Sequence, residues 1–157
     1  MSRAYRCRLD TNAAARPGGP VTYRAVQVVT GTRGVARLVV GEADTAAALG
    51  SGDVPVLGTP RLIGLCEEAT VAALAGCNSL AETTVAMRVQ VDHMQPTRLG
   101  IEVIADAVLE KVEGRRLTFT VSVSDPAGLV AAGKVVRVIV QRDRFLDKAG
   151  ITHSPST

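Results

Sequence analysis

Residues 54–76 constrain the fold more than any other part of the chain, because they form one apolar segment with helical start and stop signals. The start is Gly58-Thr59-Pro60, since a threonine caps free backbone amides and a proline suits the first helical turn. The end is Gly76. Apolar residues surround nearly the whole helix, a pattern typical of burial. Its length of about 16 residues, or ~24 Å, is short for a membrane span.

One carboxylate interrupts this apolar helix. At ~100° per residue, Arg61 and Glu68 share a stripe that can face water, whereas Glu67 projects among apolar side chains. A carboxylate on an apolar face is costly unless it is paired or protonated. Glu67 is therefore either a structural acid at the rim of the core or a catalytic acid or base, and the helix pattern leaves both readings open.

The segments around the helix alternate between apolar and polar residues, as antiparallel strands do. They cover residues 34–40, 83–93, 101–112, 117–124 and 129–140. His93 ends the apolar face of the second segment. A sheet with one apolar face needs a partner layer, which the helix supplies. The pattern predicts an α+β protein with the hot-dog fold, an antiparallel sheet wrapped around a long central helix.

The chain of 157 residues is expected to hold one domain with two loose ends. We assign residues 1–33 to a flexible basic extension, 34–146 to the hot-dog domain and 147–157 to a loose tail. A formal charge of +3, with two tyrosines, two phenylalanines and no tryptophan, disfavours a nucleic-acid partner. The polar face and the edge of the sheet suit pairing with a second copy, so we expect a homodimer.

The cysteines and the hydropathy bear on location. Three unevenly placed cysteines show neither metal-ligand spacing nor a disulfide framework, which favours a reducing compartment and no metal site. The sequence has neither an apolar run of membrane length nor a clear signal peptide. We therefore expect a cytoplasmic protein with no membrane partner.

Several short runs, taken together in this order, resemble the hot-dog thioesterases of the fluoroacetyl-CoA thioesterase type. The runs are Val56-Leu57-Gly58-Thr59-Pro60, Glu82-Thr83-Thr84-Val85-Ala86, Asp92-His93, the turn at 96–100, Glu113-Gly114-Arg115-Arg116-Leu117-Thr118-Phe119, and Val138-Ile139-Val140 ahead of Arg144-Phe145. The resemblance extends over about residues 35–146. It rests on the joint order, with Thr59 eight residues before Glu67 and His93 twenty-six after it.

The resemblance implies hydrolysis of a small or medium acyl-CoA thioester to the free acid and CoA. It implies a catalytic site of Thr59, Glu67 and His93, with Glu67 acting as a base on water or on the Thr59 hydroxyl. Arg137 corresponds to an arginine of the family and has at most a supporting role. CoA is part of the substrate, so no separate cofactor is implied, and the assembly is a homodimer or a dimer of dimers.

The sequence also departs from the family pattern. Ala86 stands where many members have glycine, and Val135 where a histidine usually follows glycine. Asp53-Val54-Pro55 occupies the region of the aromatic gate in the fluoroacetyl specialist, which argues against fluoroacetyl specificity. Two other functions stay open. One is a non-catalytic acyl-CoA-binding module. The other is an enoyl-CoA hydratase or dehydratase, which would need an Asp/His pair at the helix start, where this chain has no histidine.

Helix geometry limits how the three residues can meet. If the helix begins at Pro60, Thr59 and Glu67 lie ~12 Å apart along its axis. Either regular helix starts nearer Gly64, or Thr59 meets Glu67 of a second subunit. Each residue also has a structural reading: Thr59 as a helix cap and His93 as a strand-end or core histidine. For Arg137 that reading is a solvated strand charge, which the pattern favours.

Overall fold

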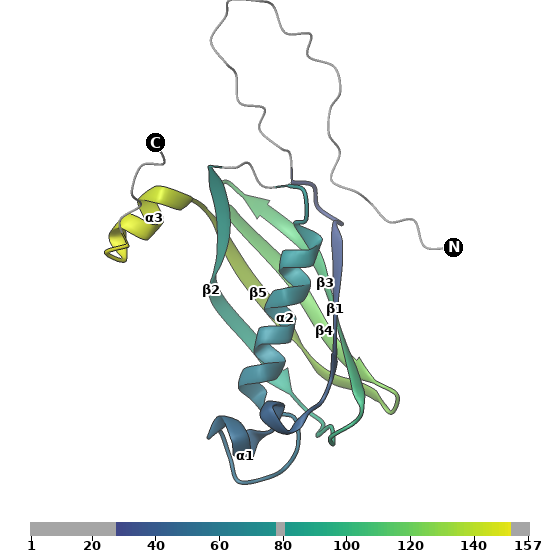
Figure 1. Ribbon diagram of the computed structural model, residues 1–157. Coiled ribbons are helices and arrows are strands. Elements are labelled where there is room, and N and C mark those ends of the chain that lie inside the picture. Colours follow the sequence, from purple (N-terminus) through teal and green to yellow (C-terminus); the bar gives the residue numbers. More distant parts are fainter. Residues whose placement is uncertain (1–27, 78–80, 152–157) are drawn as a thin grey trace, which may run out of the picture.

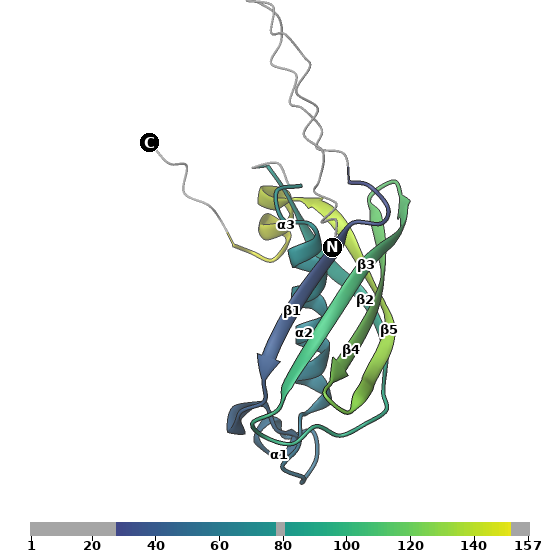
Figure 2. The ribbon, with the colours of Figure 1, turned by 90° about the vertical axis from the view of Figure 1, so that its right-hand side faces the viewer.

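A five-stranded antiparallel sheet curls around one long helix in this protein, for which a computed structural model describes residues 28–77 and 81–151 (Figures 1 and 2). The strand order across the sheet is β1-β3-β4-β5-β2. The elements, in chain order, are β1 (Arg33–Val39), the 3-10 helix η1 (Glu42–Asp44), α1 (Ala46–Leu49), α2 (Thr59–Ala73), β2 (Glu82–His93), β3 (Glu102–Glu113), β4 (Arg116–Asp125), β5 (Gly128–Gln141) and α3 (Arg142–Lys148). The predicted hot-dog fold is confirmed.

Helix α2 is covered on one side only. Its first residue is Thr59, Gly58 is the N-cap residue, and Pro60 lies in the first turn, where its missing amide costs nothing. The buried face packs mainly against β1 and β3. Its members are Leu62, Leu65, Cys66, Ala69, Thr70 and Ala73. On the other side Val71 is 53% exposed, so the prediction of a helix buried nearly all round is wrong within one chain.

The close approach of β1 to α2 depends on a glycine. A Cβ at Gly34 would overlap the backbone of Ala69 and Ala73. We therefore expect Gly34→Ala to lower the free energy of unfolding by about 1–3 kcal/mol or more, because backbone atoms of a packed helix cannot give way. Urea unfolding measures the change. Gly52→Ala is the matched control, because its added methyl meets only an ordinary contact, and an equal loss in both variants would contradict the argument.

Backbone pairing holds the entrance of α2 against the loop that follows β2. Thr45 and Leu57 form a β-bridge, as do Val56 and Arg98. The Leu57 amide also donates to the Thr97 carbonyl at 2.8 Å. The N-terminus of α2 and the C-terminus of β2, far apart in the sequence, therefore lie at the same end of the molecule.

Several outer features differ from the expectations or lie beyond them. Residues 1–27 and 152–157, most of the two predicted loose ends, lie outside the described residues, and α3 runs across the boundary placed after residue 146. Cys66 is a free buried thiol, whereas Cys77 is disulfide-bonded. The cysteine spacing indicated no disulfide framework, yet Cys77 is in a disulfide, so the cysteines no longer favour a reducing compartment. None of the described helices is both long and apolar enough to cross a membrane.

Candidate active site

Thr59 and His93 meet at the entrance of α2. The Thr59 hydroxyl Oγ1 lies 2.8 Å from Nδ1 of His93. Thr59 is the first residue of α2, and His93 is the last residue of β2. Both line a hollow of about 320 Å³ whose other walls are the segment before α2 and the loop after β2. The hydroxyl therefore contacts the imidazole, and Gly58 takes the N-cap position that the structural reading gave to Thr59.

The other ring nitrogen of His93 is buried and has no hydrogen-bond partner among the described residues. Burial lowers the pKa of His93 from its ordinary value, and the nearby Gln95 backbone acts in the opposite direction. The neutral imidazole is thus favoured, as a proton acceptor requires. If Nδ1 accepts the Thr59 proton, Nε2 carries a hydrogen, and a buried donor of that kind needs an acceptor.

Glu67 lies two turns along α2 and faces a different hollow. That hollow, of about 420 Å³, is also lined by Ile63, Val71 and Arg137. The Glu67 side chain is 39% exposed, and its carboxylate Oε2 is 4.0 Å from Nη1 of Arg137. Because α2 is helical from Thr59 onward, Thr59 and Glu67 are ~12 Å apart along its axis. One subunit therefore brings Thr59 and His93 together but leaves Glu67 apart.

Arg137 is buried, so the sequence reading of a solvated strand charge is wrong. Its side chain is only 6% exposed. Nε donates to the Thr84 hydroxyl at 3.0 Å and Nη2 to the Thr84 carbonyl at 2.9 Å, while Nη1 donates to the Thr70 hydroxyl at 3.3 Å. Burial lowers the pKa of the Arg137 guanidinium, and the charge of Glu67 raises it. Arg137 thus places a fixed positive charge beside Glu67.

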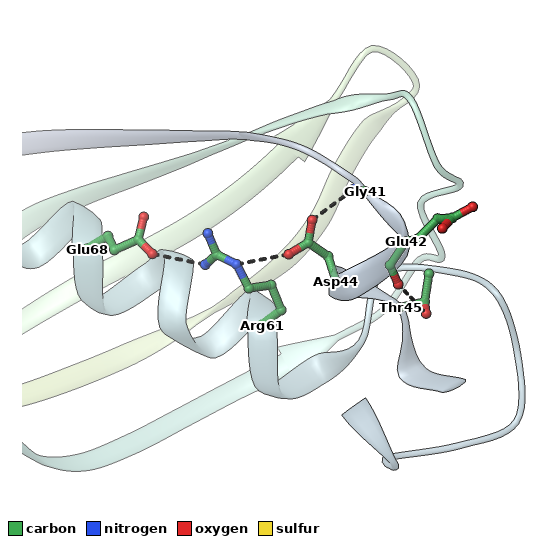
Figure 3. A network of polar contacts seen from close by, with 6 residues as sticks. All are labelled: Gly41, Glu42, Asp44, Thr45, Arg61 and Glu68. Carbon is green, nitrogen blue, oxygen red and sulfur yellow. Dashed lines mark hydrogen bonds and ion pairs between the residues drawn. The ribbon is translucent and has the colours of Figure 1, made fainter. Parts of the chain in front are cut away.

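Arg61 ties the segment before α2 to the helix (Figure 3). Its Nη1 donates to Glu68 at 2.9 Å, and its Nε lies 3.3 Å from the Asp44 carboxylate. Asp44 in turn accepts from the Gly41 amide at 2.8 Å. The sequence placed Arg61 and Glu68 on one stripe, and the ion pair confirms it. The sequence pattern did not indicate the role of Asp44 beside Arg61, or of Thr70 and Thr84 beside Arg137. These contacts join separate elements and leave no periodic signal.

The thiol of Cys66, the residue before Glu67, is unsuited to nucleophilic chemistry. Cys66 is fully buried next to Glu67 in the sequence. Burial, and then the charge of Glu67, raise the pKa of the Cys66 thiol to about 11. The reactive thiolate is therefore scarce at neutral pH. Within residues 28–77 and 81–151, no group of three or more His, Cys, Asp and Glu side chains is arranged to hold a metal ion.

The curled sheet, the long helix packed on one face of it and the polar pair at the helix entrance define a hot-dog protein. The model of the fluoroacetyl-CoA-specific thioesterase family matches residues 40–143. The chain belongs to that family, as the resemblance in the sequence indicated. A curated relative, the fluoroacetyl-CoA thioesterase of Streptantibioticus cattleyicolor, is 32% identical over 90 residues. The matched part is 57% of this chain and 65% of that enzyme, just under two thirds of its length.

Solved structures show the same likeness. A crystal structure of a variant of the fluoroacetyl-CoA-specific thioesterase FlK has a TM-score of 0.74 and 28% identity, covering 79% of this chain and 96% of that one. A variant of the same enzyme in which a threonine is replaced by alanine, in complex with fluoroacetate, has a TM-score of 0.73 and 28% identity. That match covers 78% of this chain and 97% of the other. A thioesterase superfamily member from Thermus thermophilus, at 23% identity and a TM-score of 0.73, covers 79% and 92% and shares the fold.

Proposed function

We propose that this protein hydrolyses acyl-CoA thioesters to the free acid and CoA, using Thr59, His93 and Glu67. The observation that carries the proposal is the 2.8 Å contact between the Thr59 hydroxyl and the His93 ring in an open hollow. A hydroxyl hydrogen-bonded to a neutral imidazole is the arrangement of a nucleophile with its base. Membership of a thioesterase family supports the same reaction.

The reaction then runs in two halves. Thr59 Oγ1 bonds to the thioester carbonyl carbon as its proton passes to His93 Nδ1, and the C–S bond breaks with the sulfur taking that proton. A water molecule then gives a proton to His93 and attacks the acyl-threonine, releasing the acid and restoring the hydroxyl. The Thr59 amide has no acceptor among the described residues. It lies at the N-terminus of α2, where a developing oxyanion is favoured.

Glu67 enters the site from a second copy of the chain in this proposal. Two observations support that arrangement: the unbroken helix separates Thr59 from Glu67, and Glu67 is 39% exposed at an open hollow. A carboxylate from the second subunit, placed at the hollow of Thr59 and His93, stabilises the imidazolium that forms when Nδ1 accepts the proton. The functional unit is thus a homodimer, and Arg137 places its positive charge beside Glu67.

The walls around Thr59 and His93 favour an aliphatic acyl group larger than two carbons. Ala46, Gly52, Val54 and Met94 line this hollow of about 320 Å³, and no phenylalanine, tyrosine or tryptophan lines it. Walls of small and aliphatic side chains leave room for a longer acyl chain. We therefore propose small to medium acyl-CoAs as the substrates, with fluoroacetyl-CoA disfavoured, and place the enzyme in the cytoplasm on the strength of its substrate alone.

Hydrolysis of a panel of short to long acyl-CoAs tests the proposal. We expect release of free thiol, with kcat/KM highest for small to medium aliphatic groups. An acyl-CoA-binding module would bind the panel without releasing thiol, and a hydratase would consume enoyl-CoA without releasing thiol. Mass spectrometry of the enzyme during turnover of a slow substrate is expected to find the acyl group on Thr59. Absence of thiol release across the whole panel would overturn the proposal.

The pH dependence of the rate tests the pairing of Glu67 with His93. A neighbouring carboxylate raises the pKa of an imidazole, whereas burial lowers the pKa of His93 from 6.5. In Glu67→Gln the opposing carboxylate is gone, so the acid limb of kcat/KM is expected below pH 6.5 and at lower pH than in the wild type. Profiles of kcat/KM between about pH 5 and pH 8 measure the acid limb of the wild type and that of Glu67→Gln. If the two acid limbs fell at the same pH, the pairing of Glu67 with His93 would be contradicted.

A further inference from the structure

We propose that a second hollow, the Arg98 hollow, binds the phosphates and adenosine of CoA. It is lined by Val56, Pro96, Thr97, Arg98, Ile101 and the 125–127 turn, and has a volume of about 380 Å³. The inference rests on the proposed function, because it names where the far end of the same substrate lies. CoA carries its thioester and its phosphates at opposite ends of a pantetheine arm, so the two ends require separate sites.

The Arg98 hollow adjoins the hollow of Thr59 and His93. Val56 and Pro96 line both, so these two residues form the wall between them. A substrate whose carbonyl lies at Thr59 can therefore pass over this wall with its arm and place its phosphates on the other side. Of the hollows described, the largest is lined by both Glu67 and Glu68, whose carboxylates repel a polyanion. Arg137 also lines it, but this guanidinium is buried and already donates to threonine oxygens.

Hydrogen bonds from three chain segments hold the Arg98 hollow in shape. Val56 and Arg98 form a β-bridge. Thr97 is 2% exposed, and its hydroxyl donates to Asp125 Oδ2 at 3.1 Å. The Ala127 amide donates to Asp125 Oδ1 at 2.8 Å. Both oxygens of Asp125 are thus engaged in the β4–β5 turn, and the hollow is formed before a ligand arrives, which lowers the entropy cost of binding.

Arg98 provides the charge that phosphate requires. It is exposed, and within the described part of the chain its guanidinium has neither an ion pair nor a side-chain hydrogen bond, although Asp125 lines the same hollow. A guanidinium presents a planar fork of donors that matches a phosphate. Pro96, Ile101 and Pro126 add apolar surface on which a purine can pack.

Kinetics on two forms of the same thioester test this assignment. For Arg98→Ala we expect KM for acyl-CoA to rise about tenfold or more with kcat unchanged, because a charge-assisted phosphate contact is lost. KM for the same acyl group on N-acetylcysteamine, which lacks phosphates, is expected to stay unchanged. Arg98→Lys should retain part of the affinity. Added salt should narrow the difference between wild type and Arg98→Ala, since it screens an exposed charge pair.

A matched control and a binding measurement make the outcome decisive. Arg116→Ala removes an exposed arginine at the start of β4, whereas the Arg98 hollow lies at the end of that strand. This variant is expected to leave KM unchanged for both acyl-CoA and the N-acetylcysteamine thioester. Calorimetry with CoA needs no hydrolysis, and CoA should bind Arg98→Ala about tenfold or more weakly than the wild type. Equal CoA binding, or equal effects on both thioesters, would overturn the assignment. Normal CoA binding without thiol release from any substrate would instead overturn the proposed hydrolysis.

Discussion

Replacing Glu67 with glutamine is expected to lower kcat for acyl-CoA hydrolysis by about 10²–10⁴-fold. The amide has nearly the same size, yet it carries no charge and cannot stabilise the imidazolium that forms on His93. Thiol release measures the loss. The fold should survive, because the Glu67 side chain is 39% exposed and approaches Arg137 only to 4.0 Å. Circular dichroism and size-exclusion chromatography check that the variant is folded and dimeric.

A mixing experiment decides whether Glu67 acts across the subunit boundary. Glu67→Gln and His93→Gln dimers, each inactive, are co-refolded in equal amounts. A symmetric interface then yields heterodimers in half of the population, each with one complete site, and about a quarter of wild-type activity should return. If each site lay within one subunit, no mixed dimer would hold a complete one. Failure to recover activity in verified heterodimers would therefore contradict a site shared between two subunits.

Replacing His93 with glutamine is expected to lower kcat by a similar factor, about 10²–10⁴-fold. Glutamine can still hydrogen-bond the Thr59 hydroxyl, which lies 2.8 Å from the ring in the native protein, but it cannot accept the proton. Positioning is thus retained and base catalysis is lost. Steady-state kinetics with the best acyl-CoA of the panel measure the effect on kcat and KM separately.

Asp92→Asn is the matched control for His93→Gln. Asp92 precedes His93 on β2, pairs with Ala132 and is exposed on the opposite face of the strand. Its amide variant removes a charge close to the site without touching the hollow, and we expect wild-type kcat. Comparable losses in both variants would point to a general effect on β2 rather than to loss of a base, and His93 would no longer have the proposed role.

The elements of the fold were predictable because their signals are local. Strand alternation and the Gly58-Thr59-Pro60 start predicted the helix and the four strands after it to within a few residues. The Arg61–Glu68 ion pair also follows from helical spacing alone. The prediction erred where exposure depends on neighbours: the apolar composition of α2 indicated burial all round, but the sheet covers one side and leaves Val71 exposed.

The candidate site was predictable only as a set of residue types. Glu67 stood out as an acid on an apolar helix, and His93 as the end of an apolar strand face, but no local pattern states which of them meets Thr59. Arg137 shows the same limit, because its local pattern indicated exposure where the structure has burial. On a strand it reads as a solvated charge, and it is buried only because Thr70 of α2 and Thr84 of β2 surround it.

The sequence by itself determined the helix, the strands, the faces they present and the three residue types suited to opening a thioester. Only the tertiary structure decided that Thr59 touches His93, that Arg137 is enclosed beside Glu67, and that Glu67 faces a separate hollow. The physical reason is the range of the interactions. Periodicity and caps act within a few residues, whereas the bridges from Val56 to Arg98 and from Thr45 to Leu57 set distances between segments that the chain alone leaves free.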